Sequence, residues 1–334
     1  MVGCGRIGAR RAQVAHSSGD EVVFVADVDG DRARGLAGEV GASWTTDWRE
    51  LVSLSDLEVV VVSTFNQSLP IVSSAALDAG KHVLCEKPLG RNAKEAQEVM
   101  KTARASGRVL KVGFNHRHHP GVEQAHKLAE EGAIGPLLYI RGAYGHGGRP
   151  GYDDEWRADP ELAGGGELLD QGVHLVDLAR WFLGEFSEVS GVLGTWFWRV
   201  DPLEDNAFAL LRTSRGQVAS LHSSWTQWKN LFRFEVYGRD GYLIVEGLGG
   251  SYGEERLTLG HRRPESGPPE EQFWSYPGED VSWHREWDAF RLAIREGREP
   301  VGGAEDGYAA ARLVDAIYES TRHGSTVRLE EKPA

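Results

Sequence analysis

The first third of the chain alternates short runs of β-branched residues with segments of helical periodicity, and this alternation limits the possible folds most. Four runs predict buried strands, at residues 22–26, 57–63, 81–85 and 109–114. A helix is expected at 93–106, with Asn92 as its N-cap. Strands that alternate with helices predict βαβ units, which build a doubly wound parallel sheet.

After about residue 136 the pattern changes to strands with period-two alternation. Five strands are expected, at 137–143, 189–198, 208–212, 217–225 and 232–237. Turns at 214–216 and 239–241 would join neighbouring strands into hairpins, which predicts a largely antiparallel sheet. Three helices are expected, at 167–183, 283–296 and 307–323, and 264–271 is expected to be a surface loop.

Composition excludes several classes of protein. A chain of 334 residues with 40% apolar and 26% charged residues predicts two ordinary globular domains. The net charge of -13, with no basic stretch, argues against a nucleic-acid partner, and no apolar run is long enough for a membrane span. The two cysteines, Cys4 and Cys85, predict neither a disulfide framework nor a zinc site. A reducing, cytoplasmic location is therefore expected.

A glycine-rich turn lies at the start of the chain. Gly3, Gly5 and Gly8 form the pattern G-x-G-x-x-G, with Arg6 and Ile7 between the last two, and a helix can follow. Glycines of this kind allow a tight turn and close approach of the backbone to a pyrophosphate at a helix N-terminus. The other explanation is an ordinary turn between strand and helix.

Acidic residues after the second strand support the dinucleotide explanation. Asp27 ends that strand, where a carboxylate can accept hydrogen bonds from the adenosine ribose hydroxyls. Asp29 and Asp31 follow, and three carboxylates would repel a 2'-phosphate, which favours NAD over NADP. Arg32 and Arg34 argue the other way, but helical spacing is expected to direct both into solvent.

The strand before the glycine-rich turn is short in this sequence. Only Met1 and Val2 precede Gly3, although the dinucleotide fingerprint requires a preceding strand of about five residues. Either the first strand is a stub, or the natural start of translation lies upstream.

Two further motifs carry candidate chemistry. Glu86, Lys87 and Pro88 directly follow the strand at 81–85, so Lys87 is held at a strand end rather than free in solvent. Glu86 can hold this loop or contact the nicotinamide ribose. A solvated lysine is the alternative.

The second motif is the segment 164–174, which reads GGGELLDQGVH. Asp170 and His174 are four residues apart on the helix expected at 167–183, with Asp177 one turn further, so all three share one face. A polar stripe in an otherwise apolar helix needs a reason. A hydrogen-bonded core histidine is one explanation; metal ligation is another, but no further ligand has a suitable spacing, so no metal is expected.

Taken together, these motifs resemble those of the Gfo/Idh/MocA oxidoreductase family. The resemblance includes the glycine-rich turn, Glu-Lys-Pro at 86–88, Gly-Phe-Asn-His-Arg at 113–117, Trp156-Arg157 and the segment 164–174. It implies an NAD-binding Rossmann domain over residues 1–118. An α/β domain for substrate binding and oligomerisation, with a large open and mostly antiparallel sheet, would follow over 119–334. It also implies that Lys87, Asp170 and His174 form the catalytic group.

The residues expected to contact the cofactor are Gly3, Gly5, Arg6, Ile7, Gly8, Asp27, Thr64, Asn66, Glu86, Lys87, Asn115, Trp156 and Arg157. One departure concerns the family's T-P-N-x-x-H run, which here reads Thr-Phe-Asn-Gln-Ser-Leu over 64–69. Asn66 is kept while the proline and the histidine are absent, so this loop is expected to have a different shape.

The expected reaction is oxidation of a secondary alcohol by NAD. His174 would accept the hydroxyl proton, Asp170 would orient the substrate, and Lys87 would favour alkoxide character. Lys87 and His174 could exchange the role of base. Residues expected to contact substrate are Lys87, Arg117, His118, Tyr144, His146, Arg149, Trp156, Asp170 and His174. Such side chains suit a sugar, a cyclitol or a sugar derivative, although some could simply lie on loops.

Three functions fit these residues. The first is a dehydrogenase that exchanges NAD freely, and the second is a redox-neutral enzyme that retains NAD, as in glycoside cleavage, epimerisation or sugar-to-sugar transfer. The third is a non-catalytic protein that binds NAD or sugar.

Tryptophans in the second domain bear on assembly. Trp196, Trp198, Trp225 and Trp228 lie on or beside expected strands, and Trp196 and Trp198 would share one strand face. Burial in the core is the default expectation for all four. Because helices cover only one face of an open sheet, a free face with large apolar side chains predicts a homodimer or homotetramer.

Overall fold

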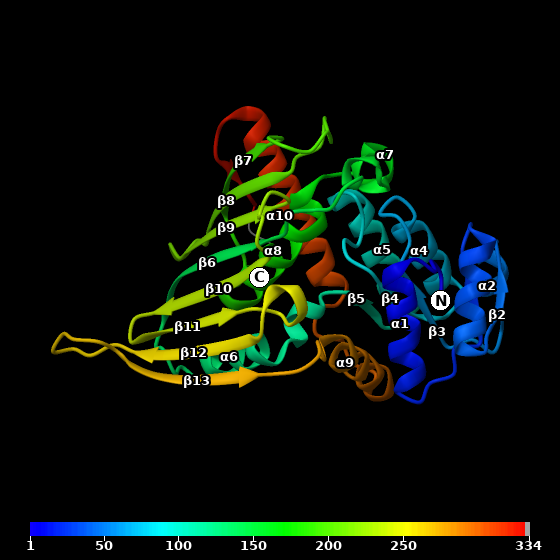
Figure 1. Ribbon diagram of the computed structural model, residues 1–334, viewed down its shortest axis with the longest axis horizontal. Coiled ribbons are helices and arrows are strands. Elements are labelled where there is room, and N and C mark those ends of the chain that lie inside the picture. Colours follow the sequence, from blue (N-terminus) through cyan, green and yellow to red (C-terminus); the bar gives the residue numbers. More distant parts are fainter. Residues whose placement is uncertain (331–334) are drawn as a thin grey trace. The chain divides into compact units, whose positions relative to one another are not determined.

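The computed structural model describes residues 1–330, which divide into two compact units (Figure 1). Unit 1 comprises Met1–Asn115, Glu161–Gly164 and Trp283–Ala311. Unit 2 comprises His116–Pro160, Gly165–Ser282 and the chain from Arg312 onward. A single boundary after residue 118 was expected; this division differs because two later segments belong to unit 1.

Unit 1 contains a parallel sheet with short strands. They are β1 (Phe24–Ala26), β2 (Ser43–Thr45), β3 (Val59–Val62), β4 (His82–Cys85) and β5 (Leu110–Val112). β1 pairs with β2, and β3, β4 and β5 pair in that order, all in parallel. All four strands expected in this part of the chain are confirmed, with shorter bounds. β2 was not expected.

Val2 joins these two groups of strands into one doubly wound sheet. It forms parallel bridges to Ala26 and to Val62, and its N–H donates to the carbonyl of Val61 (2.8 Å). The resulting order is β2, β1, Val2, β3, β4, β5, in which the first strand of the chain lies at the point where the order reverses. The first strand is thus a single bridging residue in this chain.

The helices of unit 1 begin and end at residues suited to those positions. They are α1 (Arg6–Ser17), α2 (Gly30–Val40), α3 (Trp48–Val52), α4 (Leu69–Asp78), α5 (Ala93–Ser106) and α9 (Ser282–Glu296, of which Ser282 belongs to unit 2), with the first residues of α10 (Ala304–His323). Asn92 caps α5 by accepting from the N–H of Glu95 (3.0 Å), as expected, and Gly107 ends it in a left-handed conformation.

Unit 2 is built on one large sheet. Its strands are β6 (Leu137–Gly145), β7 (Glu188–Gly194), β8 (Asn206–Arg212), β9 (Val218–Ser224), β10 (Leu231–Gly238), β11 (Gly241–Glu246), β12 (Glu255–His261), β13 (Glu270–Tyr276) and β14 (Val327–Arg328). They lie in the order β13, β12, β11, β10, β6, β9, β8, β7, β14. Only the β6–β9 pair is parallel within this described sheet, which confirms a mostly antiparallel sheet.

Helices pack on one face of this sheet (Figure 1). They are α6 (Pro120–Glu130), α8 (Val173–Leu183) and the part of α10 in unit 2. Gly142 of β6 lies against Leu175 of α8, and Gly191 of β7 lies against Ile317 of α10. Shorter turns complete the unit: η1 (Asn115–His118, of which Asn115 belongs to unit 1), η2 (Tyr152–Asp154), η3 (Trp156–Ala158), η4 (Leu168–Gly172) and η5 (Gly250–Tyr252). The short helix α7 (Pro160–Ala163) belongs to unit 1 from Glu161 onward.

Three expectations about unit 2 were wrong. The segment 167–183 is not one α-helix, because Leu168–Gly172 form a π-helical turn before α8 begins. β7 ends at Gly194, so Trp196 and Trp198 lie on the following loop and share no strand face. Burial in the core, expected for all four tryptophans, holds for Trp225, whereas Trp196 and Trp228 are 62% and 65% exposed.

Candidate functional site

The glycine-rich turn of unit 1 assigns a different role to each glycine. A Cβ on Gly3, which has a φ of +90°, would lie 2.4 Å from the carbonyl oxygen of Ser63. A Cβ on Gly8 would lie 1.8 Å from the carbonyl oxygen of Gly3, so Gly8 allows α1 to pack against the turn. Gly5 precedes α1 and faces open space. Its peptide therefore leaves room for a pyrophosphate at the N-terminus of a twelve-residue helix.

Asp27 lies beside this turn. Its carboxylate accepts hydrogen bonds from the backbone N–H of Cys4 (2.6 Å) and from that of Asp29 (2.9 Å). These bonds hold the acid at the end of β1, next to the glycines, where the adenosine ribose lies in a dinucleotide-binding fold. The donors and the space in unit 1 therefore fit NAD, with Gly5 and Asp27 as the residues that would hold it.

The two arginines that could attract a 2'-phosphate are paired with acids. Arg32 forms an ion pair with Asp29 (3.2 Å), and Arg34 forms one with Asp31 (3.2 Å). Both guanidinium groups are largely exposed, as expected, and Arg34 also lies over the Trp44 ring. This arrangement leaves little net positive charge at the end of β1, which favours NAD over NADP.

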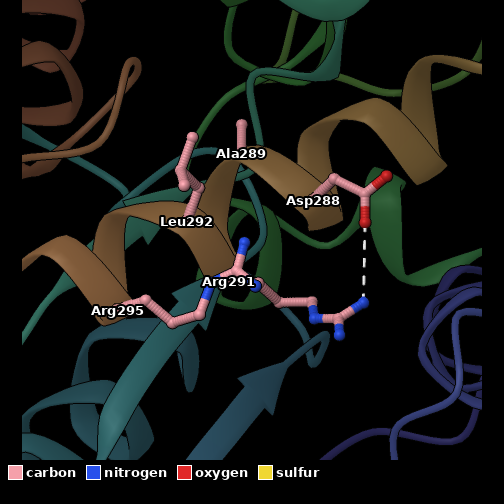
Figure 2. A pocket seen from close by; sticks show the side chains of 5 residues that line it. All are labelled: Asp288, Ala289, Arg291, Leu292 and Arg295. Atoms are coloured by element: carbon pink, nitrogen blue, oxygen red, sulfur yellow. Dashed lines mark ion pairs between the residues drawn. The ribbon is translucent and has the colours of Figure 1, made fainter.

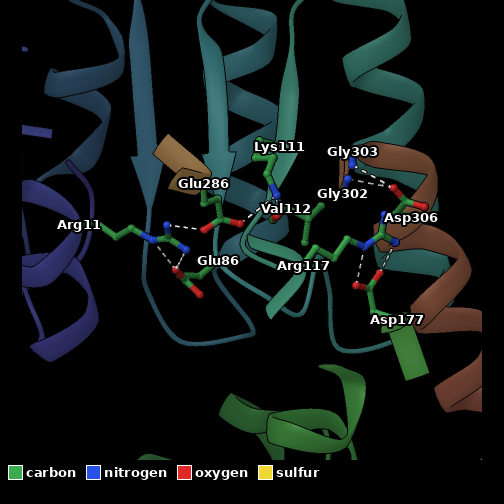
Figure 3. A network of polar contacts seen from close by, with 10 residues as sticks. All are labelled: Arg11, Glu86, Lys111, Val112, Arg117, Asp177, Glu286, Gly302, Gly303 and Asp306. Carbon is green, nitrogen blue, oxygen red and sulfur yellow. Dashed lines mark hydrogen bonds and ion pairs between the residues drawn. The ribbon is translucent and has the colours of Figure 1, made fainter. Parts of the chain in front are cut away.

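Glu86 belongs to a buried ionic network in unit 1 (Figure 3). Arg11 of α1 donates to Glu86 (2.7 Å) and to Glu286 of α9 (2.5 Å), and Lys111 of β5 donates to Glu286 (2.8 Å). Burial alone would lower the pKa of Arg11, but Glu286 and Glu86 raise it above the ordinary value. Glu86, which was expected either to hold the loop that leads to Lys87 or to contact the nicotinamide ribose, is bound to Arg11 of α1.

Lys87 follows Glu86 at the end of β4, and its peptide bond to Pro88 is cis. The loop after β3 is held to another part of unit 1: Asn66 donates to the carbonyl of Ala163 (2.8 Å), and the N–H of Gln67 donates to that of Leu162 (3.0 Å). The amide of Asn66, expected to contact the cofactor, thus ties residues 64–67 to the segment Glu161–Gly164. Asn115 is buried at the end of the same unit.

In unit 2, Glu204 fixes the start of the helix that carries the candidate acid and base. Its carboxylate accepts from the N–H of Leu168 (3.0 Å), from that of Gly166 (3.3 Å) and from the Tyr318 hydroxyl (2.8 Å). A Cβ on Gly166 would lie 2.1 Å from the Glu204 carbonyl oxygen. Burial raises the pKa of Glu204 above the ordinary value, although these hydrogen bonds oppose the change.

Arg157 holds Asp170. Its guanidinium donates to the Asp170 carboxylate (3.1 Å) and to Glu155 (3.3 Å), and it lies over the ring of Trp156. Asp170 itself lies on the π-helical turn, a local geometry often found at functional sites. Arg157, expected near the cofactor, therefore orients the candidate catalytic acid, and Trp156 supports it.

His174 lies in a wall of aromatic rings in unit 2. Its ring stacks on that of His116, with centroids 3.8 Å apart, and both side chains are buried. Tyr144 contacts the His116 ring edge-on (5.0 Å). Burial raises the pKa of Tyr144 well above the ordinary value and raises that of Tyr252 to about 12, so both phenols stay protonated near neutral pH and can donate.

His146 lies just past the end of β6. Its Nδ1 accepts from the N–H of Gly148 (2.9 Å), so its Nε2 carries the hydrogen and can donate. Burial lowers the pKa of His146, which keeps the ring neutral near pH 7. Its ring contacts that of Tyr152 (5.5 Å), and Arg149 lies over Tyr152 while pairing with Glu155.

Arg117, which was expected to contact substrate, is buried in an ion pair. Its guanidinium forms two hydrogen bonds to Asp177 (2.7 and 2.6 Å) in the protein interior and lies over the ring of Trp181. Two N–H groups of the guanidinium are used for Asp177 within unit 2, so we interpret the role of Arg117 as linking η1 to α8. Asp177, which was expected to share a face with the candidate base, is its partner. His118, on the same turn, is buried.

A surface hollow elsewhere in unit 1 includes none of the residues expected from the sequence (Figure 2). It is lined by Asp288, Ala289, Arg291, Leu292 and Arg295 of α9. Within residues 1–330, no helix is long and apolar enough to span a membrane. In the same range, no group of three or more His, Cys, Asp and Glu side chains is arranged to bind a metal ion.

Comparison with known proteins supports the dinucleotide assignment. Residues 1–114 match the model of an oxidoreductase family with an NAD-binding Rossmann fold, and residues 122–244 match the GFO/IDH/MocA C-terminal domain. Levoglucosan dehydrogenase of Pseudarthrobacter phenanthrenivorans is 31% identical over 85% of this chain and 83% of its own length. Inositol 2-dehydrogenase 2 of Saccharopolyspora erythraea is 29% identical over 100% and 95%.

Solved structures agree with these matches. A levoglucosan dehydrogenase in complex with NADH and levoglucosan has a TM-score of 0.89 and 27% identity, covering 99% of this chain and 98% of its own. An aldose-aldose oxidoreductase from Caulobacter crescentus, complexed with glycerol, has a TM-score of 0.84 and 26% identity, covering 98% of each chain. From its N-terminal and C-terminal domains alike, the chain belongs to the Gfo/Idh/MocA oxidoreductase family.

Proposed function

We propose that this protein is an NAD-dependent dehydrogenase that oxidises a secondary hydroxyl of a sugar, cyclitol or sugar derivative, in a reversible reaction. The observation that carries the proposal is an acid and a candidate base that lie one turn apart in unit 2. Asp170 is oriented by Arg157, and His174 follows one turn later, buried among aromatic rings. Unit 1 supplies a turn that fits NAD. The dehydrogenases named above act on related polyols.

The proposed roles follow from charge and proton affinity. NAD, when bound, supplies the hydride acceptor. His174 accepts the hydroxyl proton, because a neutral imidazole is a suitable base near pH 7. Asp170 accepts a hydrogen bond from the substrate, and Lys87 stabilises negative charge on the reacting oxygen. Lys87 and His174 can exchange the role of base.

The proposed substrate class rests on the donors in unit 2. Tyr144, Tyr252 and the Nε2–H of His146 are neutral donors near pH 7, and the partly exposed ring of Trp156 offers an apolar surface. Hydroxyl groups need such donors, and the C–H faces of a sugar ring stack on aromatic side chains. A pyranose or a cyclitol combines both features.

A redox-neutral enzyme that retains NAD is the second candidate. The likeness to an aldose-aldose oxidoreductase favours it, because a sugar-to-sugar transfer reduces and reoxidises the same nucleotide. The residues proposed above serve either reaction, so the fate of the nucleotide separates the two.

A panel of aldoses, inositols, anhydrosugars and glycosides, assayed with NAD and with NADP, tests the cofactor assignment. We expect the near-ultraviolet absorbance of reduced nucleotide to rise with NAD and at least one polyol, and to rise far less with NADP, because Asp27, Asp29 and Asp31 repel a 2'-phosphate. A preference for NADP would contradict the assignment. Nucleotide released only on denaturation, with no net reduction, would favour the redox-neutral enzyme.

We also propose that the open face of the sheet in unit 2 mediates a homodimer or homotetramer. This face carries Val192, Phe208 and Leu210, which are 62%, 40% and 53% exposed, and register places Val192 beside Phe208. Isolated exposed apolar residues are common, but neighbouring ones on adjacent strands mark interaction surfaces.

The proposed location is the cytoplasm, because the chain has only two cysteines.

Leu210→Glu tests this interface. A buried, unpaired carboxylate on each subunit is expected to dissociate the oligomer, so light scattering after size-exclusion chromatography should give the mass of one chain. Ile71→Glu, on an exposed apolar residue of α4 in unit 1, is the matched control and should leave the mass unchanged. An unchanged mass for Leu210→Glu would place the interface elsewhere.

A further inference from the structure

Two histidines from distant parts of the sequence stack in the interior of unit 2. His116 belongs to η1, immediately after unit 1, and His174 belongs to α8. Their ring centroids are 3.8 Å apart, the ring planes differ by 25°, and both residues are 4% exposed. The first histidine was not among the residues expected from the sequence to act at the site.

The rings around this pair fix its geometry. His116 also contacts the rings of Tyr144 (5.0 Å), His119 (5.6 Å) and Phe232 (5.6 Å) edge-on. Rings packed on several sides leave His116 little freedom to rotate away. It therefore acts as a flat support that sets the plane of the His174 ring.

Other ionisable groups lie on the elements packed around this pair. Arg117 and Asp177 neutralise each other through two hydrogen bonds, and Tyr144 stays a neutral phenol near pH 7. Behind His116, the ring of His119 contacts the carboxylate of Glu255 (3.1 Å). Further ionisable groups on the elements around α8 include Glu167 just before η4, Asp170 on η4, Tyr252 on η5, His118 on η1 and His126 on α6. The carboxylates of Glu167 and Asp170 both interact with Tyr144, which contacts His116.

We propose that His116 is a positioning residue for the base, and that the stacked pair holds one proton rather than two. Two imidazolium rings at this distance repel strongly, so a proton on either ring opposes a second proton on the other. Because His116 competes for the first proton, His174 stays neutral in part of the molecules under mildly acidic conditions. This inference rests on the proposed role of His174 as the base.

The test uses two substitutions of His116. His116→Phe keeps a flat ring for stacking but cannot bind a proton, whereas His116→Ala removes the ring. His126→Phe is the matched control, because His126 is another histidine of unit 2 that stacks on an aromatic ring, that of Trp181, with centroids 3.7 Å apart. Its side chain is 12% exposed. His126 has no proposed role in binding or chemistry.

The first readout is the titration of the His174 ring by NMR in protein labelled at histidine Cε1, which needs neither nucleotide nor substrate. The wild-type resonance is expected to titrate in two steps, and that of His116→Phe in one. At about pH 5.5 the neutral fraction of His174 should fall roughly sixfold in His116→Phe, if each imidazole binds a proton as an ordinary histidine does. His126→Phe should titrate like the wild type.

The second readout is kcat/KM against pH. On the acidic side of the profile, kcat/KM should fall gradually with decreasing pH in the wild type and steeply in His116→Phe. At about pH 8, where both rings are neutral, His116→Ala should lower kcat more than it changes KM, and His116→Phe should restore kcat.

A single-step titration of His174 in the wild-type protein, or the same curve in wild type and His116→Phe, would overturn the proposal. Because the wild-type titration is informative alone, the test does not depend on the folding of a variant. If the titration of His174 changes in His116→Phe but no polyol is turned over, the proposed function is contradicted and the proposal of a shared proton is supported.

Discussion

Replacing His174 with alanine is expected to lower kcat by about 10²-fold or more, because the variant loses the group that accepts the hydroxyl proton. The surrounding rings should keep their places, since His116 is also held by Tyr144 and Phe232. Binding of NAD, measured by quenching of tryptophan fluorescence, should therefore change little. His126→Ala, which removes a partly buried histidine outside the site, is the control for packing.

Lys87→Ala belongs to the same prediction and should lower kcat by a similar factor, about 10²-fold or more. The lysine is proposed to stabilise negative charge on the reacting oxygen, and a fixed cation of this kind contributes mainly in the transition state. Lys101→Ala is the control, because Lys101 is an exposed lysine paired with Glu98 on α5. Steady-state kinetics checks both variants, and turnover close to wild type in either would remove that residue from the mechanism.

Replacing Glu286 with alanine is expected to lower the free energy of unfolding by about 3–5 kcal/mol. Glu286 is fully buried and accepts hydrogen bonds from Arg11 and from Lys111, which are also buried. Removing the carboxylate leaves two cations in the interior without their shared partner, and burial of an uncompensated charge is costly. The loss should also loosen Glu86, which shares Arg11 with Glu286.

Denaturant unfolding measures this effect. Glu98→Ala is the matched control, because it removes an acid from an exposed ion pair with Lys101, which contributes about 0–1 kcal/mol. If Glu286→Ala lowers the free energy of unfolding by no more than the control does, the network around Arg11 does not stabilise unit 1.

Features with a local signal could be predicted from the sequence. Alternation of strand and helix patterns predicts the doubly wound sheet of unit 1, and Asn92 with Gly107 defines the ends of α5. β2 has only three residues, two of them exposed, so it lacks the apolar run by which a buried strand is found. The π-helical turn at Leu168–Gly172 was missed because its apolar residues also fit an α-helix.

The partners of the candidate site residues could not be predicted, because they are far apart in the sequence. Glu204 fixes the start of the helix at Leu168, and Arg157 orients Asp170 from a separate turn. Arg117 was expected to contact substrate, but no sequence pattern indicates that Asp177 neutralises it. Spacing within one helix indicates a shared face, whereas pairing between elements depends on the tertiary fold.

The measurement that tests the central claim most directly is transfer of hydrogen from a polyol carbon to NAD. A sugar or cyclitol deuterated at its carbinol carbons is incubated with the protein and NAD, and the nucleotide is then released by denaturation and weighed by mass spectrometry. We expect deuterium in the nucleotide for wild type and much less for His174→Ala, whether NAD exchanges or stays bound. Unlabelled nucleotide with every polyol of the panel would contradict it.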